Sequence, residues 1–464
     1  MKAIDTYYFL GIGGIGMSAL ARYYARKGYC VMGYDRTPSA LTHALEIEGM
    51  DIQYDDTIDR VERLDREHTL VVRTPAVPEE GVIYSYLRNH GFVIQKRAEV
   101  LGMLTRQKKA LCVAGTHGKT TTSTMLAHIL YQSHVGADAF LGGIANNYGT
   151  NVLLGKESDY VVVEADEFDR SFHQLTPYVS IITSMDPDHL DIYGTEEAYR
   201  ESFVHYAGLV DCALIVKHDL ELKIEDLKAK VYSYAINEEA DFYANNVRVE
   251  NGEIWFDFHT PEMVVKEICL GVPVWVNVEN SVAAMAVAWL VGVTEEELRQ
   301  GISSFTGVYR RFNVHVNTLQ VAYVDDYAHH PAELRATIES ARRLYPDRYM
   351  IGVFQPHLYS RTRDFADGFA DVLSQLDEVA LLPIYPAREE PITGVTSEWL
   401  MDKIGDVSGL KRALVLPDIL AKYLRERVKS CVKQGKKVVV LTMGAGDIDR
   451  QVDEIRDKLT YKIL

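Results

Sequence analysis

The sequence predicts an α/β protein of about three domains, and three observations support this prediction. Short apolar runs alternate with amphipathic stretches, which is the pattern of parallel strands joined by crossover helices. Two glycine-rich turns, at residues 11–16 and 115–118, each follow a strand-like run and precede a helical pattern. The chain has 464 residues, which is too many for one ordinary core and suits about three domains of usual size.

Net charge limits the possible ligands. The formal charge is −17, from 66 acidic and 49 basic side chains. A general role on nucleic acid needs many unpaired lysines and arginines, so this balance argues against one. Any anionic ligand must therefore be held by local groups.

The cysteines and the first residues indicate a compartment. The five cysteines are scattered, odd in number and without C-x-x-C spacing, so we expect neither a disulfide framework nor a zinc site. The first residues carry one lysine and a short apolar run that breaks on glycine, unlike a signal peptide. No window holds about 18 uninterrupted apolar residues. We therefore expect a soluble cytoplasmic protein with no membrane partner.

The first predicted domain, residues 1–107, opens with a turn typical of diphosphate binding. Gly11, Gly13 and Gly16 form G-x-G-x-x-G between a strand and a helix, and Asp35 follows at roughly the spacing that reads a ribose hydroxyl. Backbone N–H groups and the helix dipole bind a pyrophosphate whatever is attached to it. A dinucleotide and a UDP-sugar both fit, and a turn that only packs the helix on the strand is the alternative.

The second predicted domain, residues 108–308, opens with a short phosphate loop. Residues 115–121 read G-T-H-G-K-T-T, because Val113 stands where the common G-x-x-x-x-G-K-[ST] loop has its first glycine. The loop still joins a strand to a helix N-terminus. Lys119 would reach the β and γ phosphates of a nucleotide, and the Thr120 hydroxyl would ligate Mg²⁺. An ordinary turn with an exposed lysine is the alternative.

Acidic residues follow two further strands of this domain. They are Glu164, Asp166, Glu167 and Asp169 after the first strand, and Asp188, His189 and Asp191 after the second. Acids this close repel one another unless some meet a cation, and ligands of open α/β sheets lie at the carboxyl ends of strands. Either segment could be a solvated loop, but together, downstream of a phosphate loop, they favour Mg²⁺.

The third predicted domain, residues 309–464, also has polar residues at strand ends. They are Asp325, Asp326, Tyr327, His329 and His330 after one strand, and Gln355, His357, Arg361 and Arg363 after the next. A pocket rim explains the first group better than capping and packing alone. The arginines could hold a carboxylate or phosphate, or could be paired on the surface. Pro331 suits the first turn of a helix.

Taken together, these motifs resemble one family. The ordered set GIGGIGMS, GTHGKTTT, EADEFD, DHLD, VENS, GVYRRF, DDYAHHP, FQPHLYSRTRD and MGAGD is similar to the Mur ligases of peptidoglycan synthesis, from about residue 9 to 447. The resemblance implies a Rossmann-like N-terminal domain for a UDP-sugar, a central P-loop ATPase domain and a Rossmann-like C-terminal domain that supplies part of the amino-acid site. The short loop would be the family's own ATP loop.

The resemblance also implies an activity. It is ATP-dependent ligation of L-alanine to the lactyl carboxylate of UDP-N-acetylmuramate, the first amino-acid addition to the peptidoglycan precursor. An acyl phosphate would form, and ADP and phosphate would be released. ATP and Mg²⁺ are the implied cofactors, the sugar nucleotide and L-alanine are the implied substrates, and we expect a monomer or weak homodimer.

The site residues follow from the same resemblance. The ATP contacts would be Gly115, Thr116, His117, Gly118, Lys119, Thr120, Thr121, Asn280 and Arg311. The UDP-sugar contacts would be Gly11, Gly13, Gly14, Gly16, Met17, Ser18, Asp35 and Arg36. The amino-acid site would contain Tyr327, His329, His357, Arg361 and Arg363, and the metal would be held by Thr120, Glu164 and His189. Lys119, Glu164, His189 and His329 would be catalytic, and the base that deprotonates the amine stays open, with His329 as a candidate.

Three positions depart from the family pattern. Val276 stands where many relatives have a histidine before Asn277 and Asn280, so one adenine contact is in question. Leu358 replaces an arginine that many relatives have after FQPH. Phe203 lies in the register of the carbamylated lysine of ligases that add later residues, so no lysine carbamate is expected.

Two other functions remain open. A recycling ligase of the same superfamily attaches a murein tripeptide to the same sugar nucleotide, although its glycine loop lacks the GGIGMS form. A nicotinamide-dependent oxidoreductase could be built on Gly11, Gly13 and Gly16. It would leave Lys119, Glu164 and His189 unused.

Overall fold

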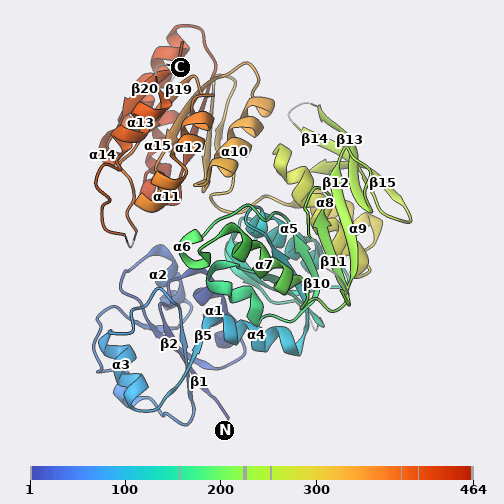
Figure 1. Cartoon of the computed structure of the whole chain (residues 1–464), viewed down its shortest axis with the longest axis vertical. Coiled ribbons are helices and arrows are strands. Elements are labelled where there is room, and N and C mark those ends of the chain that lie inside the picture. Colours follow the sequence, from blue (N-terminus) through green and yellow to red (C-terminus); the bar gives the residue numbers. More distant parts are fainter. Residues whose placement is uncertain are drawn as a thin grey trace. The chain divides into compact units, whose positions relative to one another are not determined.

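The computed structural model describes residues 3–155, 158–222, 227–250, 253–387, 389–405 and 407–460. Strands in these ranges form three sheets that follow one another along the chain (Figure 1). The chain divides into two compact units, of which the first contains Met1–Val272 and Val278–Thr306 and the second Pro273–Asn277 and Gly307–Leu464. The predicted α/β fold is confirmed. No helix in the described ranges is both long and apolar enough to cross a membrane.

The first sheet has five parallel strands in the order β3-β2-β1-β4-β5 (blue in Figure 1). Its elements are β1 Thr6–Leu10, α1 Ile15–Arg26, β2 Cys30–Tyr34, α2 Ala40–Ile47, β3 Asp51–Gln53, β4 Thr69–Arg73, α3 Val82–Asn89, β5 Val93–Lys96 and α4 Arg97–Gln107. The turn after β1 lies where the strand order reverses, which is where open α/β sheets bind ligands. That turn needs glycine, because Gly11 has φ +85° and an added Cβ would lie 2.5 Å from Thr74 Cγ2.

The second sheet has ten strands in the order β15-β14-β13-β12-β11-β10-β6-β9-β7-β8. The strands are β6 Lys109–Ala114, β7 Asp138–Ala145, β8 Thr150–Leu153, β9 Tyr160–Glu164, β10 Pro177–Ile182, β11 Ala213–Lys217, β12 Lys230–Ile236, β13 Phe242–Glu250, β14 Glu253–His259 and β15 Val264–Leu270. The helices are α5 Lys119–Gln132, α6 Leu190–Tyr193, α7 Glu196–Ala207, α8 Trp275–Leu290 and α9 Glu295–Ser304. β6 is parallel to β9 on one side and to β10 on the other, and Val113 pairs with Glu164. The loops after these three strands therefore meet at one edge of the sheet.

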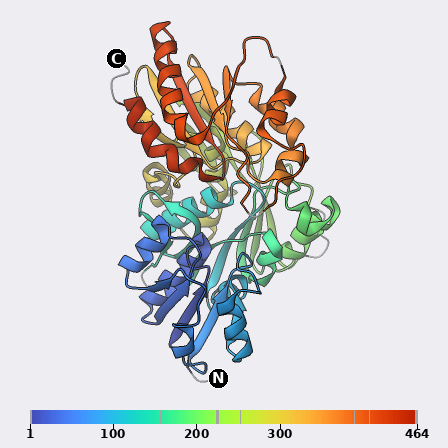
Figure 2. The same ribbon diagram turned by 90° about the vertical axis from the view of Figure 1, so that its left-hand side faces the viewer.

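The third sheet has six strands in the order β16-β17-β21-β18-β19-β20, and all but β16 are parallel. Its strands are β16 Asn313–Asn317, β17 Val321–Asp326, β18 Tyr349–Phe354, β19 Glu378–Leu381, β20 Lys411–Leu414 and β21 Val438–Met443. Its helices are α10 Pro331–Leu344, α11 Tyr359–Asp364, α12 Ala366–Leu373, α13 Ser397–Ile404, α14 Pro417–Lys433 and α15 Val452–Thr460. Figure 2 shows α14 and α15, in red, side by side; their buried Leu424 and Ile455 pack in one core with Val438 of β21.

Helix α1 joins the first two sheets into one unit. One hydrophobic core runs through both, and it includes Leu20 of α1 and Phe140 of β7. Polar bonds add to it: Arg22 Nη1 donates to Asn151 Oδ1 over 2.6 Å, and Asn151 Nδ2 donates to the Ile15 carbonyl oxygen over 2.6 Å. Asn151 is fully buried, so these bonds form away from competing water. The glycine turn at the start of α1 is thereby held at a fixed place relative to the second sheet.

Candidate functional site

The glycine turn after β1 is braced by its own acidic residue. The Gly13 N–H donates a 2.8 Å hydrogen bond to Asp35 Oδ2, and an added Cβ at Gly13 would lie 2.8 Å from the same oxygen. Asp35 thus shapes the turn, and any contact with a ribose would have to share that carboxylate. Met17 and Ser18 are buried within the unit, so their side chains face protein, whereas Arg36 is exposed beside Asp35.

The loop between β6 and α5 has the backbone of a phosphate loop in spite of its short length. Gly115 has φ +131° and Gly118 has φ +79°, a region that favours glycine. The loop after β10 fixes the turn, because Thr116 Oγ1 donates to the Asp186 carbonyl oxygen over 2.7 Å. His117 Nε2 lies 3.4 Å from the carboxylate of the same aspartate. The N-terminus of α5 follows directly, so its N–H groups point toward the turn.

The loop lysine has a buried carboxylate partner. Lys119 Nζ donates to the Gly115 carbonyl oxygen over 2.5 Å and lies 2.8 Å from Glu167 Oε2. The Glu167 side chain is only 2% exposed, and this burial raises its pKa to about 7. The positive charge of Lys119 acts in the opposite direction and lowers that pKa. Burial lowers the pKa of Lys119, but the nearby carboxylates, Glu167 first, outweigh it and raise that pKa. Glu167 lay in the predicted acidic run but was not among the predicted catalytic residues.

Two oxygen donors next to this lysine suit Mg²⁺. Thr120 Oγ1 donates to Glu164 Oε1 over 3.0 Å, which places a hydroxyl and a carboxylate together at the ends of the loop and of β9. Mg²⁺ is usually held by one or two carboxylates together with substrate phosphates, and a P-loop threonine is a common ligand. Gly142 of β7 makes room for this carboxylate, since an added Cβ would lie 2.1 Å from Glu164 Oε2. In the described ranges no group of three or more His, Cys, Asp or Glu side chains is arranged to hold a metal by itself.

The third predicted metal residue lies beside a different carboxylate. His189 Nε2 is 3.9 Å from Glu167 Oε1 and 3.7 Å from Asp188 Oδ2. His189 has φ +54°, which is uncommon for a residue with a side chain. The side chain of Asp191 lies outside the described residues.

The predicted adenine contact lies against the short phosphate loop. Asn280 of α8 accepts a 3.2 Å hydrogen bond from Thr122 Oγ1, and its Oδ1 would lie 3.0 Å from a Cβ added at Gly118. The structure therefore brings an element far along the chain to the start of α5.

A small cavity extends from the third glycine of the first turn to the carboxylates at the end of β9. Its volume is about 110 Å³, and Ile15 and Gly16 of α1, Arg97 of α4, Glu164 and Asp166 are among its lining residues. Gly16 of the glycine turn and Glu164, the hydrogen-bond partner of Thr120, thus line one space.

In the second unit, three residues of the predicted polar groups have structural roles. Asp325 is fully buried and accepts from Thr442 Oγ1 over 2.8 Å, and its Oδ2 lies 3.3 Å from Arg310 Nε. Burial raises the pKa of Asp325, and Arg310 opposes this. Gln355 Nε2 donates to Asp447 Oδ1 over 2.8 Å and so holds the loop after β21. His330 caps helix α10: His330 Nδ1 accepts from the Ala332 N–H over 3.3 Å.

Other members of the first polar group form a cluster with arginines. The Tyr327 ring lies 5.2 Å from Arg310 Cζ and 5.0 Å from Arg311 Cζ. Asp326 accepts from Thr337 Oγ1 over 2.5 Å, and burial raises its pKa to about 6. Arg310, which was not a predicted site residue, therefore helps to place Tyr327.

The two predicted histidines of the second unit lie close together. The ring centres of His329 and His357 are 6.1 Å apart, and Arg361 Nη1 is 3.5 Å from His357 Nδ1. Burial lowers the pKa of His329, which favours the neutral imidazole that a base requires. Arg363 instead pairs with Asp364 at 2.7 Å on an exposed face, so it corresponds to the surface alternative.

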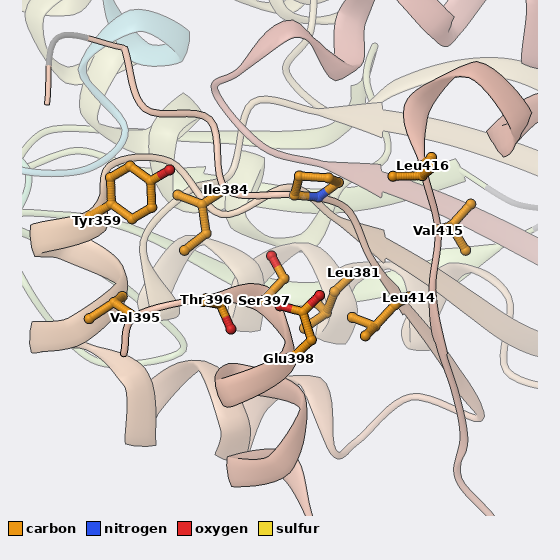
Figure 3. A pocket seen from close by; sticks show the side chains of 11 residues that line it. Tyr359, Leu381, Ile384, Val395, Thr396, Ser397, Glu398, Leu414, Val415 and Leu416 are labelled. Carbon is orange, nitrogen blue, oxygen red and sulfur yellow. The ribbon is translucent and has the colours of Figure 1, made fainter. Parts of the chain in front are cut away.

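A larger cavity of about 350 Å³ lies in the same unit (Figure 3). Tyr359 and Val395 lie at one end of it and Val415 and Leu416 at the other. The lining is mainly aliphatic, with Thr396, Ser397 and Glu398 as polar members. Of these lining residues, all within the described ranges, none is a predicted site residue.

The structure shows the surroundings of Phe203 and the backbone conformation of Leu358, two of the positions that depart from the family pattern. Phe203 is fully buried, with its ring 5.2 Å from that of Phe172 and 5.2 Å from that of Tyr199, so it belongs to an aromatic core. Leu358 has φ +68° at the start of α11, a strained conformation for a leucine between His357 and Tyr359.

Comparison with known protein families gives three consecutive matches. Residues 6–109 match "Mur ligase family, catalytic domain", residues 113–288 match "Mur ligase middle domain" and residues 310–446 match "Mur ligase, glutamate ligase domain".

Curated relatives match the whole chain. A UDP-N-acetylmuramate--L-alanine ligase of Parabacteroides distasonis is 52% identical over 100% of this chain and 99% of its own. Proteins of the same name from Phocaeicola vulgatus and Flavobacterium johnsoniae are 51% and 45% identical, each over 100% of both chains. The crystal structure of a UDP-N-acetylmuramate-alanine ligase from Thermotoga maritima is similar with a TM-score of 0.80 at 26% identity, covering 98% of this chain and 99% of that one. On these grounds the chain belongs to the Mur ligase family.

Proposed function

We propose that this protein joins L-alanine to the lactyl carboxylate of UDP-N-acetylmuramate and converts ATP to ADP and phosphate. The names of relatives 45–52% identical along the whole chain support the substrates. The observation that carries the chemistry is the shared cavity, because Gly16 of the diphosphate turn and Glu164 of the ATP side line the same space. The reaction is the first amino-acid addition to a peptidoglycan precursor, and we place it in the cytoplasm, with a monomer or weak homodimer and without nucleic-acid or membrane partners.

In this proposal each predicted domain has one substrate. Residues 1–107 hold the UDP-sugar, residues 108–308 hold ATP, and residues 309–464 supply part of the amino-acid site. Tyr327, His329, His357 and Arg361 are the residues that we assign to the last of these.

Activation of the carboxylate comes first. A carboxylate is a poor electrophile for an amine, so its oxygen attacks the γ phosphorus of ATP, the bond to the β-phosphate oxygen breaks, and an acyl phosphate forms. Lys119 offsets the charge on the moving phosphoryl group, and Glu167 keeps the lysine at the loop beforehand. Mg²⁺ held by Thr120 and Glu164 would supply further positive charge at the phosphates.

Amide formation follows. The neutral amine of L-alanine attacks the acyl carbon, phosphate leaves, and the amine loses a proton. His329 is a candidate for taking that proton, because burial lowers its pKa and the ring therefore stays neutral at pH 7.

Isotope transfer tests this mechanism. With ¹⁸O in the lactyl carboxylate, the released phosphate should carry the label and the nucleotide product should be ADP. Formation of AMP and pyrophosphate, or phosphate without label, would overturn the acyl-phosphate step.

The amine is tested separately. Phosphate release with UDP-N-acetylmuramate should be fast with L-alanine and slow with a murein tripeptide; the reverse order would favour a recycling ligase. Structures of murein peptide ligases share the fold at 21% identity, so the fold itself does not decide between the two. A change of absorbance at 340 nm with NAD(P)H would instead indicate an oxidoreductase.

A further inference from the structure

Arg97 lies between the glycine turn and the acidic residues of the ATP side. It is the first residue of α4, and its Nη2 is 3.1 Å from Asp166 Oδ2. The side chain is 26% exposed, and it lines the cavity of about 110 Å³ described above. Asp166 therefore holds the guanidinium at the cavity wall without burying it.

The third glycine of the turn makes room for this arginine. A Cβ added at Gly16 would lie 2.2 Å from Arg97 Nη1, 3.2 Å from its Cδ and 3.3 Å from its Cζ. The guanidinium thus lies directly against the backbone of the diphosphate turn. A side chain at position 16 would push the guanidinium away from the turn.

The charges around the cavity indicate that the guanidinium of Arg97 is suited to bind an anionic ligand group. Glu164 and Asp166 also line the cavity, and among the lining residues, all in the described part of the chain, Arg97 alone is basic. A carboxylate that entered would be repelled by both acids unless a cation met it. A guanidinium has five N–H donors, so contact with Asp166 leaves donors for a second carboxylate.

We propose that Arg97 binds the lactyl carboxylate of the acceptor and so selects sugar nucleotides that carry this acid. The inference deepens the proposed function and rests on it. The turn at Gly16 would hold the diphosphate of the nucleotide. Arg97 lies against Gly16 and lines the same cavity as Glu164. A carboxylate held there would be oriented toward the ATP loop before it is activated.

Binding measurements with two nucleotides test this role. UDP-N-acetylmuramate and UDP-N-acetylglucosamine share the nucleotide and the sugar ring, but only the first has the lactyl carboxylate. Calorimetry on the full chain should show that Arg97→Met raises Kd for UDP-N-acetylmuramate about 10- to 100-fold, the effect of losing a charge-assisted hydrogen bond. Kd for UDP-N-acetylglucosamine should change by less than about threefold, and Arg97→Lys should fall between Arg97→Met and the unchanged protein for the acid-bearing ligand.

Lys96→Met is the matched control. Lys96 precedes Arg97 and also pairs with an acid of the loop after β9, at 3.2 Å from Asp169 Oδ2, but it does not line the cavity. Its substitution should leave both Kd values unchanged. Thermal melting of each variant reports whether the fold is kept, and if Arg97→Met does not fold, Arg97→Lys carries the comparison.

Three results would overturn the assignment. Equal weakening of both nucleotides would mean that Arg97 binds the diphosphate or shapes the turn. Unchanged binding of both would leave it as a partner of Asp166 only, and a similar loss in Lys96→Met would point to general charge. Product formation by the unchanged protein is measured independently, so absence of alanine ligation with a selective loss in Arg97→Met would refute the proposed function and leave the carboxylate site standing.

Discussion

Replacing Gly142 by alanine tests whether the carboxylate beside Thr120 must stay in place. The new Cβ would lie 2.1 Å from Glu164 Oε2 and 2.5 Å from its Cδ, whereas ordinary contact begins at 3.4 Å. The carboxylate must therefore move by about 1.3 Å, the difference between 3.4 and 2.1 Å. The 3.0 Å bond from Thr120 Oγ1 to Glu164 Oε1 depends on the same group, so it would break. A displacement of about 1 Å at a reacting centre costs on the order of 10²-fold in rate.

The assay is phosphate release with saturating UDP-N-acetylmuramate, ATP and L-alanine across a range of Mg²⁺ concentrations. We expect kcat to fall about 100-fold, and the Mg²⁺ concentration at half-maximal rate to rise. Glu164→Gln should raise the same Mg²⁺ requirement, because it removes one anionic partner.

Gly208→Ala is the control for a bare methyl group. At Gly208 an added Cβ would meet its nearest atom, the His205 carbonyl oxygen, at 3.3 Å, which needs only a few tenths of an ångström of adjustment. Rate and Mg²⁺ dependence should stay as in the unchanged protein. If Gly142→Ala also keeps the rate within threefold with the same Mg²⁺ dependence, the placement of Glu164 does not matter for catalysis.

Three further predictions concern charged groups. Lys119→Ala should leave UDP-N-acetylmuramate binding, measured by calorimetry, nearly intact and lower turnover by several orders of magnitude, because the charge acts mainly on the transferring phosphoryl group; substantial turnover would contradict this. Burial raises the pKa of Asp326 from 3.8 to about 6, so the folded state holds this proton more tightly and the free energy of unfolding falls as pH rises from about 4 to 6. Asp326→Asn can still accept from Thr337, and it should flatten that part of the pH curve by roughly 2–3 kcal/mol in denaturant titrations; an unchanged slope would refute the assignment. Arg310→Met leaves the carboxylate of Asp325 buried without its cation and should lower the free energy of unfolding by about 3–5 kcal/mol, with partial recovery in the double variant that also carries Asp325→Leu.

Local features of the fold and the site could be predicted from the sequence. The turns at Gly11, Gly115 and Gly118 all have positive φ, because a tight link between a strand and a helix needs a conformation that glycine adopts freely. The carboxyl end of β9 delivers Glu164 beside Thr120, as the order of motifs indicated. These features depend on neighbours in the sequence or on the general rule that ligands gather at strand ends.

Features that depend on distant pairings could not be predicted. Nothing near Gly142 indicates that β7 will lie beside β9 and hold a carboxylate against that glycine. Arg97 meets Gly16 only because α4 and α1 pack in one unit. Glu167 follows Asp166 and Arg310 precedes Arg311, so each has a neighbour of the same charge. Only the burial of the Glu167 and Arg310 side chains, which the sequence does not reveal, distinguishes them from these neighbours.

The bonds of Asn151 have a consequence for chimeric ligases. Its side-chain amide bonds to Arg22 and to the Ile15 carbonyl oxygen of α1, while its backbone belongs to β8. The contact between the first two sheets is therefore formed by two distant parts of the sequence. An N-terminal segment transplanted from a ligase of different acceptor specificity would bring a new α1 but would meet the original β8, so the two sides of this contact would no longer match. To exchange acceptor specificity, β7 and β8 would therefore have to be transplanted together with α1, although neither strand belongs to the first sheet.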